Sequence, residues 1–386
     1  MLRLRSCIAS HLLSPTSCST SPTSHLRRRL SSSAPPISPN PGFAVEDYLV
    51  DTCGLTRPQA LKASRRIPRL KSSSNPDAVL DFLAGLGLSS TDLAATVAKD
   101  PKLLCADVER TLAPKVVGLT GLGLSRSEIA RLVALAGTHF RGTPIVSRLQ
   151  YYLPFFGSFE NFLRPVKRSS YLLGFDPERT VKPNVTFLRE CGLDDCDIVK
   201  LCAISPSMFT AKSRRVREIV ACAEGLGVPR GSGMFRAALQ AVSHLNEEKI
   251  ATKLEYLKKT FRWSDAEVSH AVSKAPALLR KPKEALRSRS EFLISDVGLE
   301  PAYIAHRPVI LYYSMERRLR PRYYVLKFLK VNGLLDQNRD YYNSIVLSEM
   351  AFVEKFVCPH KESAPDLAED YATICKGELP ANFRFT

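Results

Sequence analysis

Lysine and arginine residues recur in short runs along the chain, and phosphate binding is the chemistry that such runs perform. The densest run spans residues 307–330 and holds seven basic residues against a single acid, Glu316. Further runs lie at 65–71, 164–168, 212–217 and 280–289. Because phosphate neutralisation supplies most of the affinity for nucleic acid, these runs predict a surface that binds a nucleic-acid backbone.

We predict that eleven residues from the runs at 212–217, 280–289 and 307–330 contact nucleic acid. They are Arg214, Arg215, Arg217, Lys281, Lys283, Arg287, Arg289, Arg317, Arg318, Arg320 and Arg322. Helical spacing places only about half of the last four on one face. The alternative for any single run is a solvated helix face. Four tyrosines interleave with the last run, namely Tyr312, Tyr313, Tyr323 and Tyr324. Their rings could stack on unpaired bases, but aromatic pairs at helical spacing more often belong to the core.

Signals for an enzyme are weak. The glycine-rich stretch 227–233 has no lysine after it, so it does not resemble a phosphate loop. Glu267 and His270 have the spacing of a metal-ligand pair, but no second Glu-x-x-His exists, and a helix cap explains Glu267 better. The ten cysteines include no Cys-x-x-Cys pair and are expected to be reduced, small apolar residues. We therefore expect no catalysis, no metal and no cofactor.

The net charge indicates the class of partner, and the composition of the first residues indicates the cellular compartment. The formal net charge is +17, which favours nucleic acid or an anionic membrane surface. Residues 1–45 contain five Arg, eleven Ser and no acid, the composition of an organelle transit peptide, with a disordered basic tail as the alternative. Without those five arginines, 50 basic residues remain against 38 acidic ones, which leaves +12. No apolar run is long enough to span a bilayer, so we expect no membrane insertion.

The elements that position these cations form a repeat. A short phrase with glycine second recurs at intervals of 33 to 36 residues, with its second residue at 54, 87, 123, 157, 192, 227, 262, 298 and 333. Eight of these nine residues are Gly, and Arg262 is the exception. Glycine in this position predicts a helix end closed by a left-handed residue. The capping boxes Thr56-x-x-Gln59, Ser125-x-x-Glu128 and Ser264-x-x-Glu267 predict that a new helix begins there.

A proline recurs inside the repeat. It stands fourteen residues after the turn residue at Pro68, Pro101, Pro206 and Pro276, and Pro308 occupies a shorter version. Large apolar residues follow it, as in Leu103-Leu104. The proline is therefore predicted to end the first helix and to open a short turn whose apolar residues pack inward. No period-two strand pattern of useful length occurs, so we predict an all-α solenoid of about nine two-helix units.

The units 86–119, 261–293 and 297–329 resemble the mTERF motif of the mitochondrial transcription termination factor family, and the resemblance covers about residues 45–371. Pentatricopeptide and tetratricopeptide repeats have similar lengths but lack this proline. The resemblance implies a left-handed superhelix of two helices and a short turn per unit. It also implies a basic concave groove for duplex DNA or structured RNA. Three units, those beginning at 123, 157 and 227, depart from the motif because they lack the proline.

We therefore divide the chain into a transit peptide (1–44), a repeat domain (45–350) and a C-terminal helical cap and tail (351–386). The expected function is regulation of organellar transcription, or RNA processing, by binding DNA or RNA. Partners would be organellar nucleic acid and transcription or splicing proteins, with the chain a monomer. The alternatives are a scaffold for a protein partner and an RNA-only group II intron splicing factor. The leucine- and arginine-rich start favours the mitochondrion, with the chloroplast as the alternative.

Overall fold

The structure, a computed structural model, describes residues 43–378, and all regular structure in that range is helical. This confirms the all-α prediction. The predicted transit peptide lies almost entirely outside the described residues. From Phe43 onward the chain forms one compact unit, in which the C-terminal α21 (Leu367–Cys375) packs against α18 (Arg320–Val331). Within the described range, no helix has both the length and the apolar content that a bilayer crossing needs.

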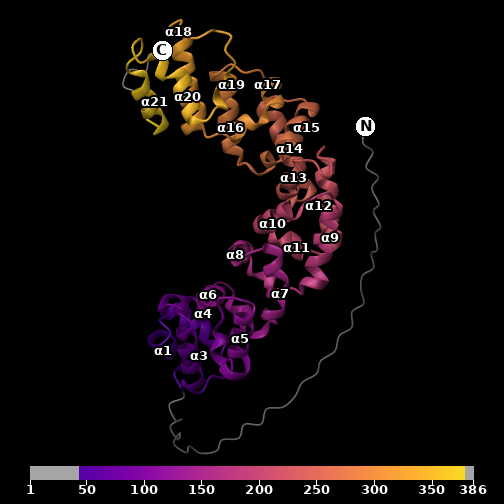
Figure 1. Cartoon of the computed structure of the whole chain (residues 1–386), viewed down its shortest axis with the longest axis vertical. Coiled ribbons are helices and arrows are strands. Elements are labelled where there is room, and N and C mark those ends of the chain that lie inside the picture. The colour runs from indigo at the N-terminus through magenta and orange to yellow at the C-terminus, as the bar shows by residue number, and fades with distance from the viewer. Residues whose placement is uncertain (1–42, 379–386) are drawn as a thin grey trace, which may run out of the picture. The chain divides into compact units, whose positions relative to one another are not determined.

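Helix pairs follow one another along the chain (Figure 1). The first helices of successive pairs are α2 (Arg57–Ser64), α4 (Ser90–Lys99), α6 (Arg126–Gly142), α8 (Phe159–Arg168), α10 (Asp195–Ile204), α13 (Phe235–Val242), α15 (Asp265–Lys274) and α17 (Pro301–His306). The second helices are α3 (Ser74–Gly85), α5 (Ala113–Gly121), α7 (Ile145–Phe156), α9 (Lys182–Glu190), α12 (Ser213–Gly225), α14 (Glu247–Phe261), α16 (Lys283–Glu291) and α18. The series is preceded by α1 (Val45–Asp51) and followed by α19 (Tyr341–Ile345), α20 (Glu349–Phe356), the short turn Cys358–His360 and α21.

Every residue of the predicted turn series has a positive φ. The eight glycines lie between +70° and +102°. Arg262 adopts φ 56° and is the one non-glycine residue with positive φ among residues 43–378. Because a side chain crowds the backbone in this region, glycine is the residue that closes these helices most easily. The three predicted capping boxes, which begin at Thr56, Ser125 and Ser264, are also present.

The recurring proline opens a short turn, as predicted. At four of the five prolines the first helix ends just before the proline, and the turns run over Pro101–Cys105, Pro206–Thr210, Pro276–Arg280 and Pro308–Tyr312. In the first repeat the helix already ends at Ser64, ahead of Pro68. Two large apolar residues in each of these turns, such as Leu103 and Leu104, are buried, whereas Val309, directly after Pro308, is exposed. The residue before each of these prolines lies outside the helical region, with φ between −127° and −141°, because proline disfavours the helical conformation there. We call these segments, and their equivalents in the other repeats, the inter-helix turns.

Repeats without the proline also interrupt the helix at the equivalent position, but by other means. In the fourth repeat, Ser170–Gly174 forms a 3-10 turn that buries Leu172 and Leu173. In the third repeat α6 continues to Gly142 but is kinked at Ala136, whose φ of −131° matches that of residues before the prolines. Several second helices also contain a π-type turn, namely at Val108–Leu112, Pro177–Val181, Phe292–Asp296 and Met315–Leu319. The proline therefore strengthens a break that the packing of the repeats produces without it.

Candidate nucleic-acid interface

One polar side chain from each second helix reaches backbone carbonyls at the inter-helix turn of the next repeat. Carbonyls at the end of a helix have no partner within the helix, so these side chains satisfy groups that would otherwise be unpaired. We call these residues the carbonyl donors. They are Asn75, Lys115, Arg148, Asn184, Arg215, Lys253, Arg289 and Arg322. Three of the predicted nucleic-acid contacts are therefore also carbonyl donors.

Arg322 corrects the sequence prediction. Its side chain is 0% exposed, so its guanidinium cannot reach a phosphate. It donates to the carbonyl oxygens of Ile345 and Leu347 at 2.9 and 2.7 Å. It also forms a 2.7 Å ion pair with Glu349 and lies over the Phe352 ring. The residue joins α18 to α19 and α20, which is a structural role.

Arg289 and Arg215 are partly used in the same way. Arg289 is half-buried and donates to the carbonyl oxygens of Ala285 and Tyr313. Burial lowers the pKa of its guanidinium. Arg215 is exposed but donates to Leu245 and pairs with Glu218. Their recurrence in the sequence therefore follows from the repeat itself as well as from any ligand.

Three exposed predicted contacts form ion pairs with acids on their own helix. Arg214 pairs with Glu218 at 3.1 Å, Arg287 with Glu284 at 2.7 Å and Arg320 with Glu316 at 3.3 Å. Exposed pairs of this kind contribute about 0–1 kcal/mol, so a phosphate can replace the carboxylate at little cost. These residues remain available for binding.

The other exposed or half-exposed predicted contacts lie mostly on aromatic rings. Lys281 lies over Tyr312, Lys283 over Tyr256 and Arg318 over Tyr313, at 5.6, 5.2 and 4.8 Å from the ring centroids. Arg217 lies over Phe187 in the same way. Cation–π contact restrains a long side chain while leaving its charge partly exposed. Arg317 is exposed, and no ion pair is recorded for its side chain within residues 43–378.

The seventh and eighth repeats bring several of these residues together. Arg289 donates to the carbonyl of Tyr313, and the ring of Tyr313 carries Arg318. Lys281 lies on the neighbouring Tyr312. Burial, and to a lesser degree the charge of Arg289, lowers the pKa of Lys281. The inter-helix turn Pro308–Tyr312 is therefore surrounded by cations from two repeats.

Two of the interleaved tyrosines, Tyr323 and Tyr324, make structural contacts. Tyr324 is 4% exposed, and its hydroxyl donates to Asp370 in α21. Tyr323 packs edge-on against Phe292 and donates to the carbonyl of Asp296. These contacts favour the core interpretation over base stacking for this pair. Glu267, the other ambiguous residue, accepts from Ser264 in its capping box, and these hydrogen bonds lower its pKa.

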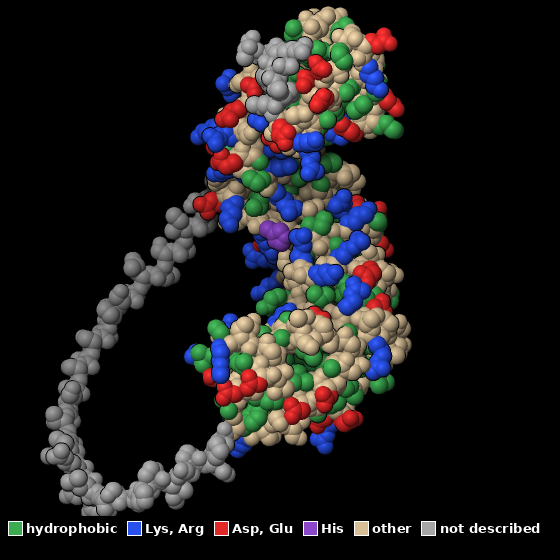
Figure 2. Space-filling model, turned by 90° about the vertical axis from the view of Figure 1, so that its left-hand side faces the viewer, with side chains coloured by type: hydrophobic (Ala, Val, Ile, Leu, Met, Phe, Trp, Pro, Cys, Tyr) green, Lys and Arg blue, Asp and Glu red, His purple; other side chains and the backbone are tan. Residues whose placement is uncertain are grey.

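Charge is unevenly spread over the surface. Figure 2 shows one face, on which Lys and Arg side chains gather across the middle, and Asp and Glu are more frequent toward the two ends. A phosphate backbone is attracted to such a field, with an on-rate that falls as salt is added.

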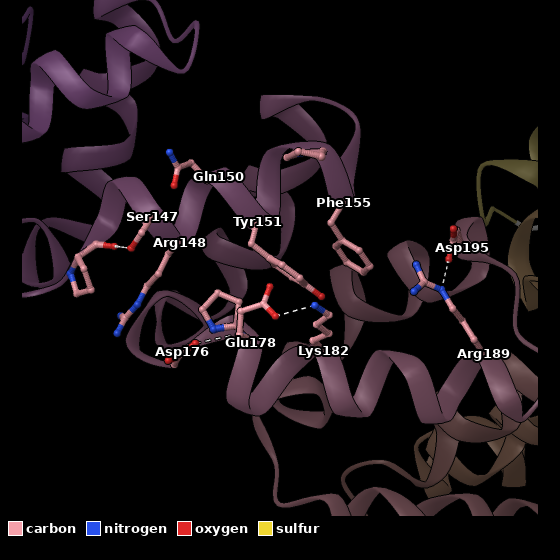
Figure 3. Close-up of a pocket in the computed structure, with 13 residues that line it drawn as sticks. Ser147, Arg148, Gln150, Tyr151, Phe155, Asp176, Glu178, Lys182, Arg189 and Asp195 are labelled. Carbon is pink, nitrogen blue, oxygen red and sulfur yellow. Dashed lines mark hydrogen bonds and ion pairs between the residues drawn. The ribbon is translucent and has the colours of Figure 1, made fainter.

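A cleft of about 750 Å³ between α7 and α9 has a different character (Figure 3). Its wall includes the stacked rings of Tyr151 and Phe155. Three basic and three acidic residues line it, and two pairs of them are joined, Glu178 with Lys182 and Arg189 with Asp195. Because the charges balance, this cleft does not suit a phosphate backbone.

Comparison with known proteins identifies the family. The family model named mTERF matches residues 57–137 and 147–351, which is most of the chain. The chain belongs to the mTERF family. The repeats described above are thus mTERF repeats, as their resemblance to the motif had indicated.

Two curated mTERF relatives are similar in sequence. Transcription termination factor MTERF8, chloroplastic, from Arabidopsis thaliana is 20% identical over 265 residues, which cover 66% of this chain and 50% of that protein. Transcription termination factor 3, mitochondrial, from Drosophila melanogaster is 26% identical over 235 residues, which cover 51% of this chain and 66% of that protein. The chain thus spans about half of the first relative and about two thirds of the second.

The carbonyl donors are the residues that sequence reasoning missed. Lys115, Arg148 and Lys253 belong to no predicted site, yet each holds a neighbouring repeat. Their position in the repeat could have revealed them, because a carbonyl donor stands 8 to 12 residues before each turn residue. Arg289, for example, precedes Gly298, and Lys115 precedes Gly123. A second missed feature is the ring contact of His270 with His306 across two repeats.

Proposed function

We propose that this mTERF protein binds organellar nucleic acid through exposed cations at and beside its inter-helix turns, and so regulates transcription or transcript processing without catalysis. The observation that carries the proposal is the gathering of Lys281, Lys283, Arg317, Arg318 and Arg320 in two neighbouring repeats. Duplex DNA or structured RNA is the ligand. The two relatives are named as transcription termination factors of organelles, and that supports this class of role.

The composition of the first 44 residues supports import into an organelle. We favour the mitochondrion over the chloroplast because the segment starts with leucine and arginine and contains an arginine cluster at 27–29. Imaging of the full chain fused at its C-terminus to a fluorescent protein tests this. Retention in the cytosol would contradict it.

Charge reversal of Arg317, Arg318 and Arg320 together to Glu tests the function. Affinity for a duplex DNA and for an RNA hairpin, measured by fluorescence anisotropy, should fall by about 100-fold or more for the ligand class that binds. Arg126, Lys249 and Lys361 are exposed and lie outside the predicted runs, so their triple reversal to Glu is the matched control. Equal affinities of the two variants would contradict the proposed surface.

The balanced cleft of Figure 3 favours a second candidate, a scaffold that holds a protein partner. Aromatic side chains are enriched in surfaces that bind a polypeptide. In that case, Phe155→Ala would reduce binding of an organellar protein, and the interaction would change little with salt. Under the first proposal the same substitution leaves nucleic-acid affinity unchanged.

A further inference from the structure

A second cationic surface lies at the other end of the repeat series. It is a cleft of about 860 Å³ formed by the inter-helix turns of the first three repeats. Six of its lining residues are basic: Arg65, Arg66, Arg69, Lys71, Lys102 and Arg141. None of the lining residues is acidic. The cleft thus differs from the balanced cleft of Figure 3, although the two have similar volumes.

Each of the three repeats contributes from the same part of its unit. Residues 65–71 link α2 to α3, Lys102 belongs to the turn Pro101–Cys105, and Arg141 lies in the last turn of α6. Ile67, Leu103 and Leu104 are buried in these turns, whereas the cations beside them are exposed or partly exposed. Stacking of successive turns therefore converts three short sequence segments into one concave basic surface.

A buried acid fixes two of the six cations. Asp100, directly before Pro101, is 2% exposed. One of its carboxylate oxygens lies 3.6 Å from Arg66, and the other lies 3.5 Å from Arg141. Arg66 also donates to the carbonyl of Lys99 at 2.8 Å. The acid thus holds guanidinium groups from the first and third repeats on the two sides of the second.

The two guanidinium groups remain able to bind an anion. The Arg66 and Arg141 side chains are 44% and 40% exposed. A guanidinium has five N–H donors, and each group uses only part of that set within the fold. Because Asp100 has already restricted their rotamers, less side-chain entropy is lost when a phosphate binds.

The other four cations are exposed, and no carboxylate pairs with them in the described part of the chain. Arg65, Arg69, Lys71 and Lys102 form no recorded ion pair with any residue in the described part of the chain. They add positive charge around the fixed pair without competing carboxylates. The cleft therefore combines a positioned pair of donors with a surrounding field of charge, which is the arrangement that phosphate recognition requires.

We propose that this cleft is a phosphate-binding subsite for the nucleic-acid backbone, separate from the cations of the seventh and eighth repeats. Arg66 and Arg141 are its positioned donors, and Asp100 is the positioning residue. Arg65, Arg69, Lys71 and Lys102 supply long-range attraction. The inference rests on the proposed function and extends it, because it places a second contact about two hundred residues away in the chain. The sequence showed a basic run at 65–71 there, but none of the six cations was among the predicted contacts.

The test is the quadruple variant Arg65→Gln, Arg69→Gln, Lys71→Gln and Lys102→Gln in the full chain. Its matched control removes four exposed cations outside the cleft, with Arg126→Gln, Lys249→Gln, Lys361→Gln and Lys376→Gln. Anisotropy is measured with the nucleic acid that the wild-type chain binds. We expect the cleft variant to lose at least about tenfold in affinity and the salt slope to flatten by about two to four, with a much smaller change in the control.

A second variant tests the positioned pair without changing charge. In Arg66→Lys with Arg141→Lys the charge is kept, but the forked donor geometry is lost. Affinity should fall several-fold, while the thermal midpoint, measured beside it, reports any loss of folding. Unchanged affinity in this variant would show that Asp100 positions nothing of importance for binding.

The outcomes separate the inference from the proposed function. If the wild-type chain retains no nucleic acid, the proposed function is wrong and the inference is wrong with it. If the wild type binds and the quadruple variant binds equally well with the same salt slope, only the inference is wrong. It is also wrong if ATP binds the wild type in a manner sensitive to the quadruple variant while nucleic-acid affinity stays unchanged, since the cleft would then be a nucleotide site.

Discussion

The first three repeats and the eighth repeat are both rich in cations, but they use them differently. In the N-terminal cleft, four of six cations have no recorded ion pair within the described range, and a buried acid orients the other two. In the run 307–330, which is the densest in the sequence, most cations already have a partner within the fold. The density of charge in the sequence is therefore a poor guide to the charge that a ligand can reach.

The contrast within the eighth repeat is sharper still. Arg317 and Arg322 are five residues apart in the same run. One is exposed, and the other is fully buried against the carbonyls of the next turn. The difference follows from where each residue lies on its helix, because only one face of a second helix meets the following repeat.

The largest expected effect is a loss of stability when a carbonyl donor is removed. Arg322→Met removes the donor to Ile345 and Leu347 and leaves buried carbonyls unpaired, so the free energy of unfolding should fall by about 3 kcal/mol. Arg317→Met is the matched control and should change it by about 0.5 kcal/mol or less. Urea denaturation of the full-length proteins measures both. Equal stabilities would mean that Arg322 does not hold the C-terminal helices.

A smaller effect concerns the acid that partners Arg322. Burial alone would raise the pKa of Glu349, but hydrogen bonds from Tyr371 and Arg322 outweigh it and lower the pKa below the ordinary value of 4.5. A lowered carboxyl pKa contributes stability above the ordinary value, and that contribution is lost as pH falls through the lowered value.

Glu349→Gln should therefore be less stable than the wild type near neutral pH, and the difference should shrink as the pH falls below about 4.5. Thermal midpoints across acidic buffers measure this. Glu354→Gln, an exposed position on the same helix, is the control. A difference that stays constant with pH would show that the charge of Glu349 does not contribute.

Much of the fold could be predicted from the sequence because its signals are local. Glycine at the turn series, capping boxes such as Ser264 with Glu267 and the proline that follows each first helix act over a few residues. Backbone sterics near Gly298 or Pro276 are the same in any helical protein. The predicted positions of the helix ends and turns were therefore confirmed.

The site could be predicted only in part because its decisive contacts are between repeats. Arg289 reaches Tyr313, and Asp100 holds Arg66 and Arg141 from two other repeats. Such contacts depend on how one helix is rotated against the next, and the amino-acid sequence does not specify that rotation directly. Asp100 was visible in the sequence, but its burial between two arginines was not.

The central claim is that exposed cations, and not those built into the fold, bind phosphate. The most direct test is the slope of log K against log salt for the full chain and for Arg317→Gln with Arg318→Gln and Arg320→Gln, on the nucleic acid that the wild type binds. Each phosphate contact contributes about 0.9 to this slope on duplex DNA, so the triple variant should flatten it by about two to three, and Arg322→Met, where folded, should leave it unchanged. A triple variant with the wild-type slope would contradict the account.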